Sequence, residues 1–263
     1  MAYYSPMAAD PRAAPTVEAF DYERYQDHLD IVRTYGPTAR FMDRVIRRVG
    51  ARLTGMRVLD LGCGTGHISR MFEGRNTVVS YDPALQGVRI TRARRARRGG
   101  FVVGGGEALP FSDAAFDAVL LIDVLEHIPD HRRVATEIRR VLRPGGYVFC
   151  MVPENMRLYS RIDAANGHVR RYSREELLDV FAPCVPEVLF DYGFPFMRLY
   201  LSLLAPVHDA VVPQAPPTGL PRLAIRAASV ALTALFSVDL LFAGWFRGVE
   251  LVALLRKPAS APA

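Results

Sequence analysis

Two aspartates around a glycine-rich turn are the residues of this 263-residue chain whose types and spacing could do chemistry. The turn reads Gly62-x-Gly64-x-Gly66, and it follows an apolar run typical of a buried strand. Turns of this kind, between a strand and a helix, commonly receive the phosphates of a nucleotide. Here Asp60 precedes the first glycine by two residues, and its carboxylate would repel a pyrophosphate. We therefore expect a ligand with a cationic end.

The second aspartate, Asp82, ends the next apolar run, twenty residues after Gly62. A carboxylate at this spacing suits the two hydroxyls of a ribose. His67 stands where a dinucleotide fingerprint has its third glycine, and no lysine follows the turn as it would in a P-loop. A nucleoside with a positively charged tail fits this pattern, and among common cofactors S-adenosylmethionine is such a molecule.

The elements that must position these acids alternate between strands and helices. Strands are predicted at 57–61, 77–81, 101–103, 118–122, 146–152, 189–194 and 248–257. Helices are predicted from about residue 66, at 84–97, at 131–141 and, after a capping box that begins at Ser173, at 175–181. This alternation predicts an α/β fold, a Rossmann-like, doubly wound, seven-stranded sheet.

The remaining segments flank that sheet. Residues 1–40 read as a tail and an N-terminal helical cap, 41–193 as the core, 247–257 as the final core strand and 258–263 as a second tail. Between core and last strand, residues 194–246 form an apolar helical insertion. The insertion could be a lid, a homodimer face or a membrane-surface element.

Four motifs in order resemble the class I S-adenosylmethionine-dependent methyltransferases, most closely those of quinones and small molecules. The motifs read VLDLGCGTGHI, SYDPA, EALPFSDAAFDAVLLIDVLEHI and LRPGGYVFCMVP. The resemblance covers about residues 41–191 and 249–257. It implies an enzyme that uses S-adenosylmethionine and releases S-adenosylhomocysteine.

The resemblance also implies roles along the cofactor. Asp60 and the backbone of the turn would hold its amino-acid end, and Asp82 would bind the ribose. The residues implied in cofactor binding are Asp60, Gly62, Cys63, Gly64, Asp82, Pro83, Glu107, Ala108, Leu109 and Asp123, with Tyr81 beside the adenine. Relatives often carry an acid where this chain has Gly105, so either Glu107 substitutes for it or the contact is missing.

The acceptor side depends on residues after the fifth strand. His168, in GHVRRYSREEL, follows that strand at the sheet edge where open α/β folds bind ligands, so we expect a catalytic or substrate-orienting role, with Asp123 near the sulfonium. Arg170 and Tyr172 are expected at the substrate, although all three could instead brace the loop. His127 and His131 lie four apart, but Pro129 interrupts them and no third ligand is evident, so no metal site is expected.

The acceptor is expected to be a hydrophobic small molecule because the apolar insertion joins the sixth and seventh strands. Tyr22 and Tyr25 could close over it as a lid or simply pack the cap. O-methylation of a natural product and methylation of a lipid or quinone at the membrane surface are both compatible with the sequence. A non-catalytic assembly protein remains an alternative, while Asp60 and His67 disfavour a dinucleotide oxidoreductase.

Composition limits the partners. The net charge of +6 is concentrated in an arginine run over 89–98, which we interpret as a solvated helix face without nucleic-acid contacts. Three widely spaced cysteines and the lack of a signal-peptide pattern favour the cytoplasm. Residues 227–246 have nearly the length of a bilayer span, but Asp239 disfavours insertion, so membrane association stays the alternative.

Overall fold

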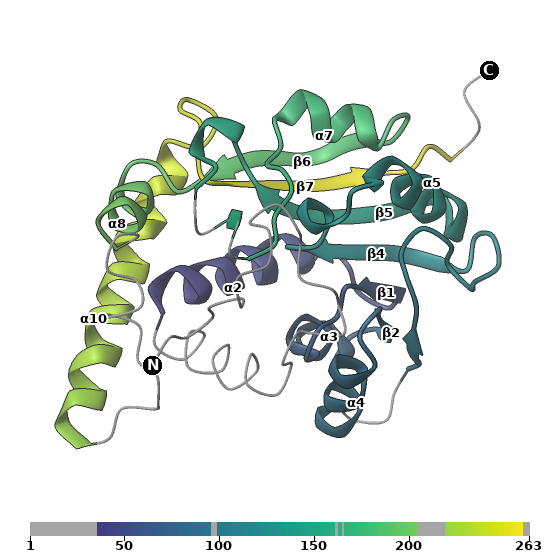
Figure 1. The fold of residues 1–263 in the computed structure, drawn as a ribbon, viewed down its shortest axis with the longest axis horizontal. Helices are drawn as coiled ribbons and strands as arrows, with labels where there is room; N and C mark the ends of the chain where they lie inside the picture. The colour runs from purple at the N-terminus through teal and green to yellow at the C-terminus, as the bar shows by residue number, and fades with distance from the viewer. Residues whose placement is uncertain (1–35, 96–98, 161–162, 165, 205–218, 260–263) are drawn as a thin grey trace, which may run out of the picture.

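The computed structural model describes residues 36–95, 99–160, 163–164, 166–204 and 219–259. Its strands form one seven-stranded sheet in the order β3-β2-β1-β4-β5-β7-β6. Neighbouring strands from β3 to β5 are parallel, and β7 runs antiparallel to both β5 and β6. The predicted Rossmann-like, doubly wound sheet is therefore confirmed (Figure 1).

The strands agree with the sequence predictions in number and order and differ mainly at their ends. They are β1 Arg57–Leu61, β2 Thr77–Asp82, β3 Phe101–Val103, β4 Phe116–Ile122, β5 Leu142–Pro153, β6 Val185–Tyr192 and β7 Glu250–Arg256. The largest error concerns β6, which begins four residues before the predicted start and ends before Phe194. Strand β5 pairs from Leu142 onward, so the LRPGG segment both ends a helix and opens a strand.

The helices occupy the crossovers and the insertion. They are α2 Pro37–Gly50, α3 His67–Glu73, α4 Leu85–Arg94, α5 His131–Val141, α7 Arg174–Val180, α8 Phe196–Leu204 and α10 Gly219–Val238. Short 3₁₀ turns η2 Leu125–His127, η3 Met156–Leu158 and η5 Asp239–Leu241 lie between them. The predicted capping box is present, with Ser173 and Glu176 each accepting a hydrogen bond from the backbone of the other.

Two apolar layers cover the two faces of the sheet. Successive strand residues point to opposite faces, so Leu59 joins the layer under α5 and α7 while Val58 joins the layer under α2 and α3. Phe236 of α10 and Met197 of α8 extend the second layer. Because these layers on both faces are largely apolar, polar groups gather mainly at the ends of the strands.

Helix α2 belongs to the core as much as to a cap. Phe41, Val45 and Ile46 are buried against the sheet, and the expected boundary at residue 40 falls inside this helix. Most of the expected N-terminal cap, up to residue 35, lies outside the described residues.

The insertion starts from the carboxyl end of β6 and returns to β7 (Figure 1). Helix α10 packs its inner face on α2, where Phe236 contacts Phe41 edge-on at 6.4 Å between ring centroids. Asp239 lies after the end of α10, at the start of η5. Its carboxylate accepts the backbone N–H groups of Phe196 and Met197 at 3.0 and 2.9 Å, so it caps α8.

Candidate functional site

The glycine turn between β1 and α3 packs closely against Val124 and Thr91. Gly62 and Gly66 have φ angles of +79° and +80°, which side chains rarely adopt. A Cβ atom at Gly62 would lie 2.4 Å from Val124 Cγ2, and one at Gly66 would lie 2.6 Å from Thr91 Cγ2. Larger residues are therefore excluded at both positions by backbone conformation and by space.

Asp82 ties the glycine turn to the end of β2. Its two carboxylate oxygens accept the N–H groups of Gly64 at 2.8 Å and Ala84 at 2.9 Å. The N–H groups of Gly62 and Cys63 both donate to the carbonyl of Tyr81. Asp82 is 4% exposed, and each of its oxygens has a second lone pair for a ligand hydroxyl.

Asp60 lies at the start of a buried polar chain that the sequence did not indicate. It accepts a hydrogen bond from Ser69 at 2.5 Å, Ser69 contacts Ser80 at 2.6 Å, and Arg95 donates to Ser80 at 2.5 Å. Arg95 also pairs with Glu73 at 2.9 Å. Burial raises the pKa of Asp60 to about 6, and the neighbouring Asp82 adds to the shift while Ser69 and Arg95 oppose it.

The interpretation of the arginine run as a solvated face is wrong for Arg95. Its side chain is fully buried, donates to the carbonyl of Val78 and lies over the ring of Phe101 at 5.1 Å. Arg89, Arg92 and Arg94 are exposed, as expected. Residues 96–98 lie outside the described chain.

The segment expected at the adenine edge follows β3. Leu109 is buried, and its N–H donates to Glu137, while Pro83 and Ala108 are exposed on the neighbouring turns. A Cβ atom at Gly105 would lie 3.0 Å from an Oε atom of Glu107. The carboxylate of Glu107 thus borders the space that a side chain at position 105 would use. Tyr81, by contrast, is 1% exposed and packs within the core.

On the acceptor side, His168 is held by a carboxylate. Its Nδ1 lies 3.0 Å from Asp163, which also accepts two hydrogen bonds from Arg171 at 2.8 and 3.0 Å and two from Ser160. Although burial opposes it, the hydrogen bonds from His168 and Arg171 hold the pKa of Asp163 well below its ordinary value. Sequence reasoning missed Asp163, whose only signal was a position five residues before His168.

His127 meets His168 rather than His131. The rings of His127 and His168 are 4.8 Å apart at their centroids, and both Nε2 atoms lie 4.0 Å from Oε1 of Glu126. His131 instead contacts the hydroxyl of Tyr172 at 2.7 Å. His127 and His131 therefore do not form a pair, as expected from Pro129 between them, but an acidic side chain does lie beside the pair of His127 and His168, which was not expected from the sequence.

The other residues expected at the substrate differ in their surroundings. Tyr172 is 1% exposed and its hydroxyl donates to the carbonyl of Leu125, while Arg170 donates to the carbonyl of Pro129. Both border a hollow of about 460 Å³ beside α5 and α7. Asp123 follows β4 with φ at +54°, at the carboxyl edge of the sheet. Tyr22 and Tyr25 lie outside the described residues.

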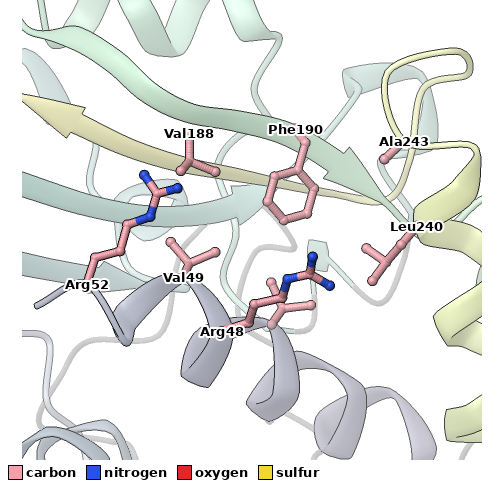
Figure 2. Close-up of a pocket in the computed structure, with 8 residues that line it drawn as sticks. Arg48, Val49, Arg52, Val188, Phe190, Leu240 and Ala243 are labelled. Carbon is pink, nitrogen blue, oxygen red and sulfur yellow. The ribbon is translucent and has the colours of Figure 1, made fainter.

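A second hollow, of about 370 Å³, lies between α2 and the sheet and is shown in Figure 2. Arg48 of α2 and Arg52, in the turn after this helix, stand on one side, and Val188, Phe190 and Leu240 line the other. None of the residues expected to bind the cofactor borders it.

The sequence is similar to those of known methyltransferases. Residues 59–150 match a family of methyltransferase domains. The chain is 32% identical over 174 residues to a phthiotriol/phenolphthiotriol dimycocerosates methyltransferase of Mycobacterium ulcerans, covering 64% of this chain and 59% of that protein. It is 29% identical over 205 residues to a demethylmenaquinone methyltransferase of Thermotoga maritima, covering 69% of this chain and 88% of that protein.

Among solved structures, an S-adenosylmethionine-dependent methyltransferase from Mesorhizobium loti superposes with a TM-score of 0.59 at 16% identity, over 84% of this chain and 100% of that one. The chain thus carries a methyltransferase domain over residues 59–150, in agreement with the enzyme class and cofactor expected from the motifs, and the superposition agrees with the predicted fold. It spans only about half to three fifths of the length of several curated relatives.

Proposed function

We propose that this chain transfers the methyl group of S-adenosylmethionine to a hydrophobic small molecule, by O-methylation in natural-product biosynthesis. The observation that carries this proposal is the hydrogen bond from the N–H of Gly64 to Asp82, which places the carboxylate expected to bind the ribose beside the glycine turn. When bound, S-adenosylmethionine would supply an electrophilic methyl carbon to the acceptor oxygen and would leave as S-adenosylhomocysteine with the electron pair of the broken carbon–sulfur bond, while the hydroxyl proton would pass to water.

The chain's own residues mainly bind and align. Asp60 faces the cationic amino-acid end, Asp82 binds the ribose hydroxyls, and Glu107 replaces the acid missing at Gly105. His168, held by Asp163, orients the acceptor. Alignment of reacting groups contributes roughly 7 to 11 kcal/mol in favourable cases.

A hydrophobic acceptor is supported by the position of the insertion. Strand β6 runs parallel to β5, because both are antiparallel to β7, so α8 and α10 follow the same sheet edge that carries Asp60 and Asp82. An apolar molecule could reach that edge along these helices.

A second candidate, methylation of a lipid or quinone at the cytoplasmic membrane surface, is favoured by the outer face of α10. Arg222–Leu241 is long and apolar enough to cross a membrane by length and composition, yet only 22% of this stretch is buried. Leu223 and Leu241 are 65% and 76% exposed, whereas Thr233 on the inner face is fully buried. The outer face thus exposes large apolar side chains, as does a helix that lies on a bilayer.

The charges around this face also suit anionic lipid. Arg222, Arg226 and Arg247 are exposed, and Asp239, the acidic residue in the described part of the insertion, is buried as a helix cap. Trp245, 82% exposed, is a residue type enriched at membrane interfaces. The hollow shown in Figure 2 is lined by the cationic side chains of Arg48 and Arg52 and by apolar side chains.

The proposed reaction is tested by incubating the protein with S-adenosylmethionine labelled in its methyl group and an extract of hydrophobic metabolites. Mass spectrometry then identifies the labelled product. A labelled methyl ether supports the proposal, and a labelled amine or carbon skeleton overturns O-methylation. Release of S-adenosylhomocysteine without a labelled product overturns the choice of a hydrophobic acceptor.

The membrane candidate is tested by sedimentation with vesicles of phosphatidylcholine, with and without phosphatidylglycerol. We expect binding to the anionic vesicles and its loss in a Leu241→Ser, Trp245→Ser double variant. Val185→Ser, which removes an equally apolar residue that is 54% exposed at the other end of β6, is the matched control. Unchanged binding in the double variant contradicts a membrane face, and a dimer in solution that the double variant dissolves assigns the face to a second copy.

A further inference from the structure

Three side chains from two separate segments converge at the acceptor side of the sheet edge. Glu126 and His127 belong to η2, directly after β4, and His168 follows β5, the neighbouring strand. One ligand atom from each, a carboxylate oxygen or a ring nitrogen, lies within 4.8 Å of the other two. The N–H of Val169 donates to the carbonyl of Glu126 at 2.9 Å, which fixes the two segments side by side.

The carboxylate at the centre of this cluster has no hydrogen-bond donor. Glu126 is fully buried, and neither of its oxygens has a hydrogen-bond partner among the described residues. A buried carboxylate normally has such partners or binds a cation. The side chains of His127 and His168 are 39% and 13% exposed, so the cluster can be reached from solvent on the histidine side.

Each histidine is oriented through its surroundings. Asp163 accepts from Nδ1 of His168, which leaves the Nε2 lone pair directed to the side of Glu126. His127 interacts with the backbone of Gly167. Carboxylate and backbone partners of this kind are those that metal-binding histidines commonly have.

The distances fit one small ion. Zinc bonds nitrogen and oxygen at about 2.0 to 2.2 Å, so two ligands of one ion lie at most about 4.3 Å apart. Oε1 of Glu126 is 4.0 Å from both Nε2 atoms, within that limit. In the tetrahedral geometry typical of zinc, ligand atoms lie about 3.3 to 3.6 Å apart, so each histidine must approach Glu126 by about half an ångström and the three ligand atoms, now within 4.8 Å of one another, must draw together.

We propose that Glu126, His127 and His168 bind a divalent transition-metal ion, for which two imidazoles and one carboxylate are a suitable donor set. Three protein ligands leave a coordination position open, as in zinc sites that bind a substrate. An oxygen of the methyl acceptor would complete the coordination, and this last step rests on the proposed function. The orienting role of His168 would then be exerted through the ion.

The test uses tag-free protein freed of metal with a chelator and titrated with Zn²⁺, followed by metal analysis after dialysis. We expect one ion per chain and a visible ligand-field spectrum when Co²⁺ replaces Zn²⁺. Glu126→Gln and His127→Gln should each weaken binding by at least about tenfold. His131→Gln is the matched control, since it removes a histidine four residues from His127 that contacts Tyr172 instead.

Each outcome of this test bears on the proposal. No retained zinc, or equal affinity in wild type and in His127→Gln, overturns it. Zinc whose affinity falls in His131→Gln but not in Glu126→Gln is adventitious and also overturns it. His127→Gln changes the most exposed of the three ligands, so it tests the site even if Glu126→Gln fails to fold. S-Adenosylmethionine binding is measured on the same samples. Its absence would contradict the proposed function and leave the metal result standing.

Discussion

The carboxyl edge of the sheet has two halves that handle buried charge differently. At β1 and β2, the carboxylate of Asp60 is connected through Ser69 and Ser80 to the guanidinium of Arg95. At β4, β5 and β7, Glu126, Glu154 and Glu250 are buried or partly buried, and each has at least one side-chain oxygen without a hydrogen-bond partner among the described residues.

The site around Asp60 therefore contains its own cation, Arg95, whereas the site around Glu126 can accept a cation as a ligand. Burial raises the pKa of Glu126 and of Glu250 well above the ordinary value, and the charge of Asp123 adds to both shifts. In the first half the compensating charge is part of the protein. In the second half Arg247 lies 4.0 Å from Glu154, whereas the charge of Glu126 can be compensated at close range by a ligand, a metal ion or a proton.

The largest effect is expected from removing the cation of the first half. Arg95→Met leaves Glu73, Ser80 and Asp60 without their shared guanidinium. Because a buried partner is left uncompensated, we expect a loss of about 3 to 5 kcal/mol in the free energy of unfolding, measured by denaturant titration. Arg89→Met, on the exposed part of the same helix, should stay within about 0.5 kcal/mol. Equal losses in the two variants would contradict a structural role for Arg95.

A smaller loss is expected when the glycine turn itself is changed. Gly62→Ala places a methyl group 2.4 Å from Val124 in a backbone conformation with φ at +79°. Strain and overpacking together should cost about 2 to 4 kcal/mol in unfolding free energy. Gly74→Ala is the control, since its φ is −65° and nothing lies within 4 Å of the added atom. An unaffected Gly62→Ala would show that the turn can rearrange.

The third prediction concerns the pH dependence of cofactor affinity in the first half. Burial raises the pKa of Asp60 to about 6, and only its ionised form attracts the cofactor's ammonium group. Affinity should therefore fall as pH falls through 6, by about tenfold between pH 7 and pH 5, since roughly a tenth of Asp60 is ionised at pH 5. Calorimetric titrations across this range measure it. Asp60→Asn should bind weakly with a flat profile, and a flat wild-type profile would contradict the role of Asp60.

The smallest effect is expected in the second half. Glu126→Gln replaces a buried carboxyl group, which accepts no hydrogen bond from any described residue, by an uncharged group of the same shape. In metal-free protein at neutral pH, the unfolding free energy should change by less than about 1 kcal/mol or rise. Denaturant titration beside Arg95→Met makes the comparison direct. A loss as large as that of Arg95→Met would mean that the two halves do not differ.

The two halves of the carboxyl edge also differ in how well the sequence predicts them. The glycine turn, Asp60 and Asp82 lie within one βαβ unit, where spacing along the chain sets spacing in space, so motif and sheet order were predictable. The capping box at Ser173 was equally local and was confirmed.

Contacts across long separations were not predictable in this way. His127 and His168 are 41 residues apart and meet only because β4 and β5 are neighbours in the sheet. Arg95 looks like any other residue of an arginine run until α4 is placed over β2 and β3. The capping of α8 by Asp239 links two helices through tertiary packing, which no periodicity reveals.

The central claim, that the first half binds S-adenosylmethionine, is tested most directly by calorimetric titration of that cofactor into wild type and Asp82→Ala. Binding should weaken by roughly a hundredfold in the variant, about 2 to 3 kcal/mol, because a buried acceptor of hydrogen bonds is lost. Asp113→Ala, an acid whose side chain is 79% exposed, should bind as wild type does. A wild type that does not bind, or an Asp82→Ala variant that binds equally well, would contradict the account.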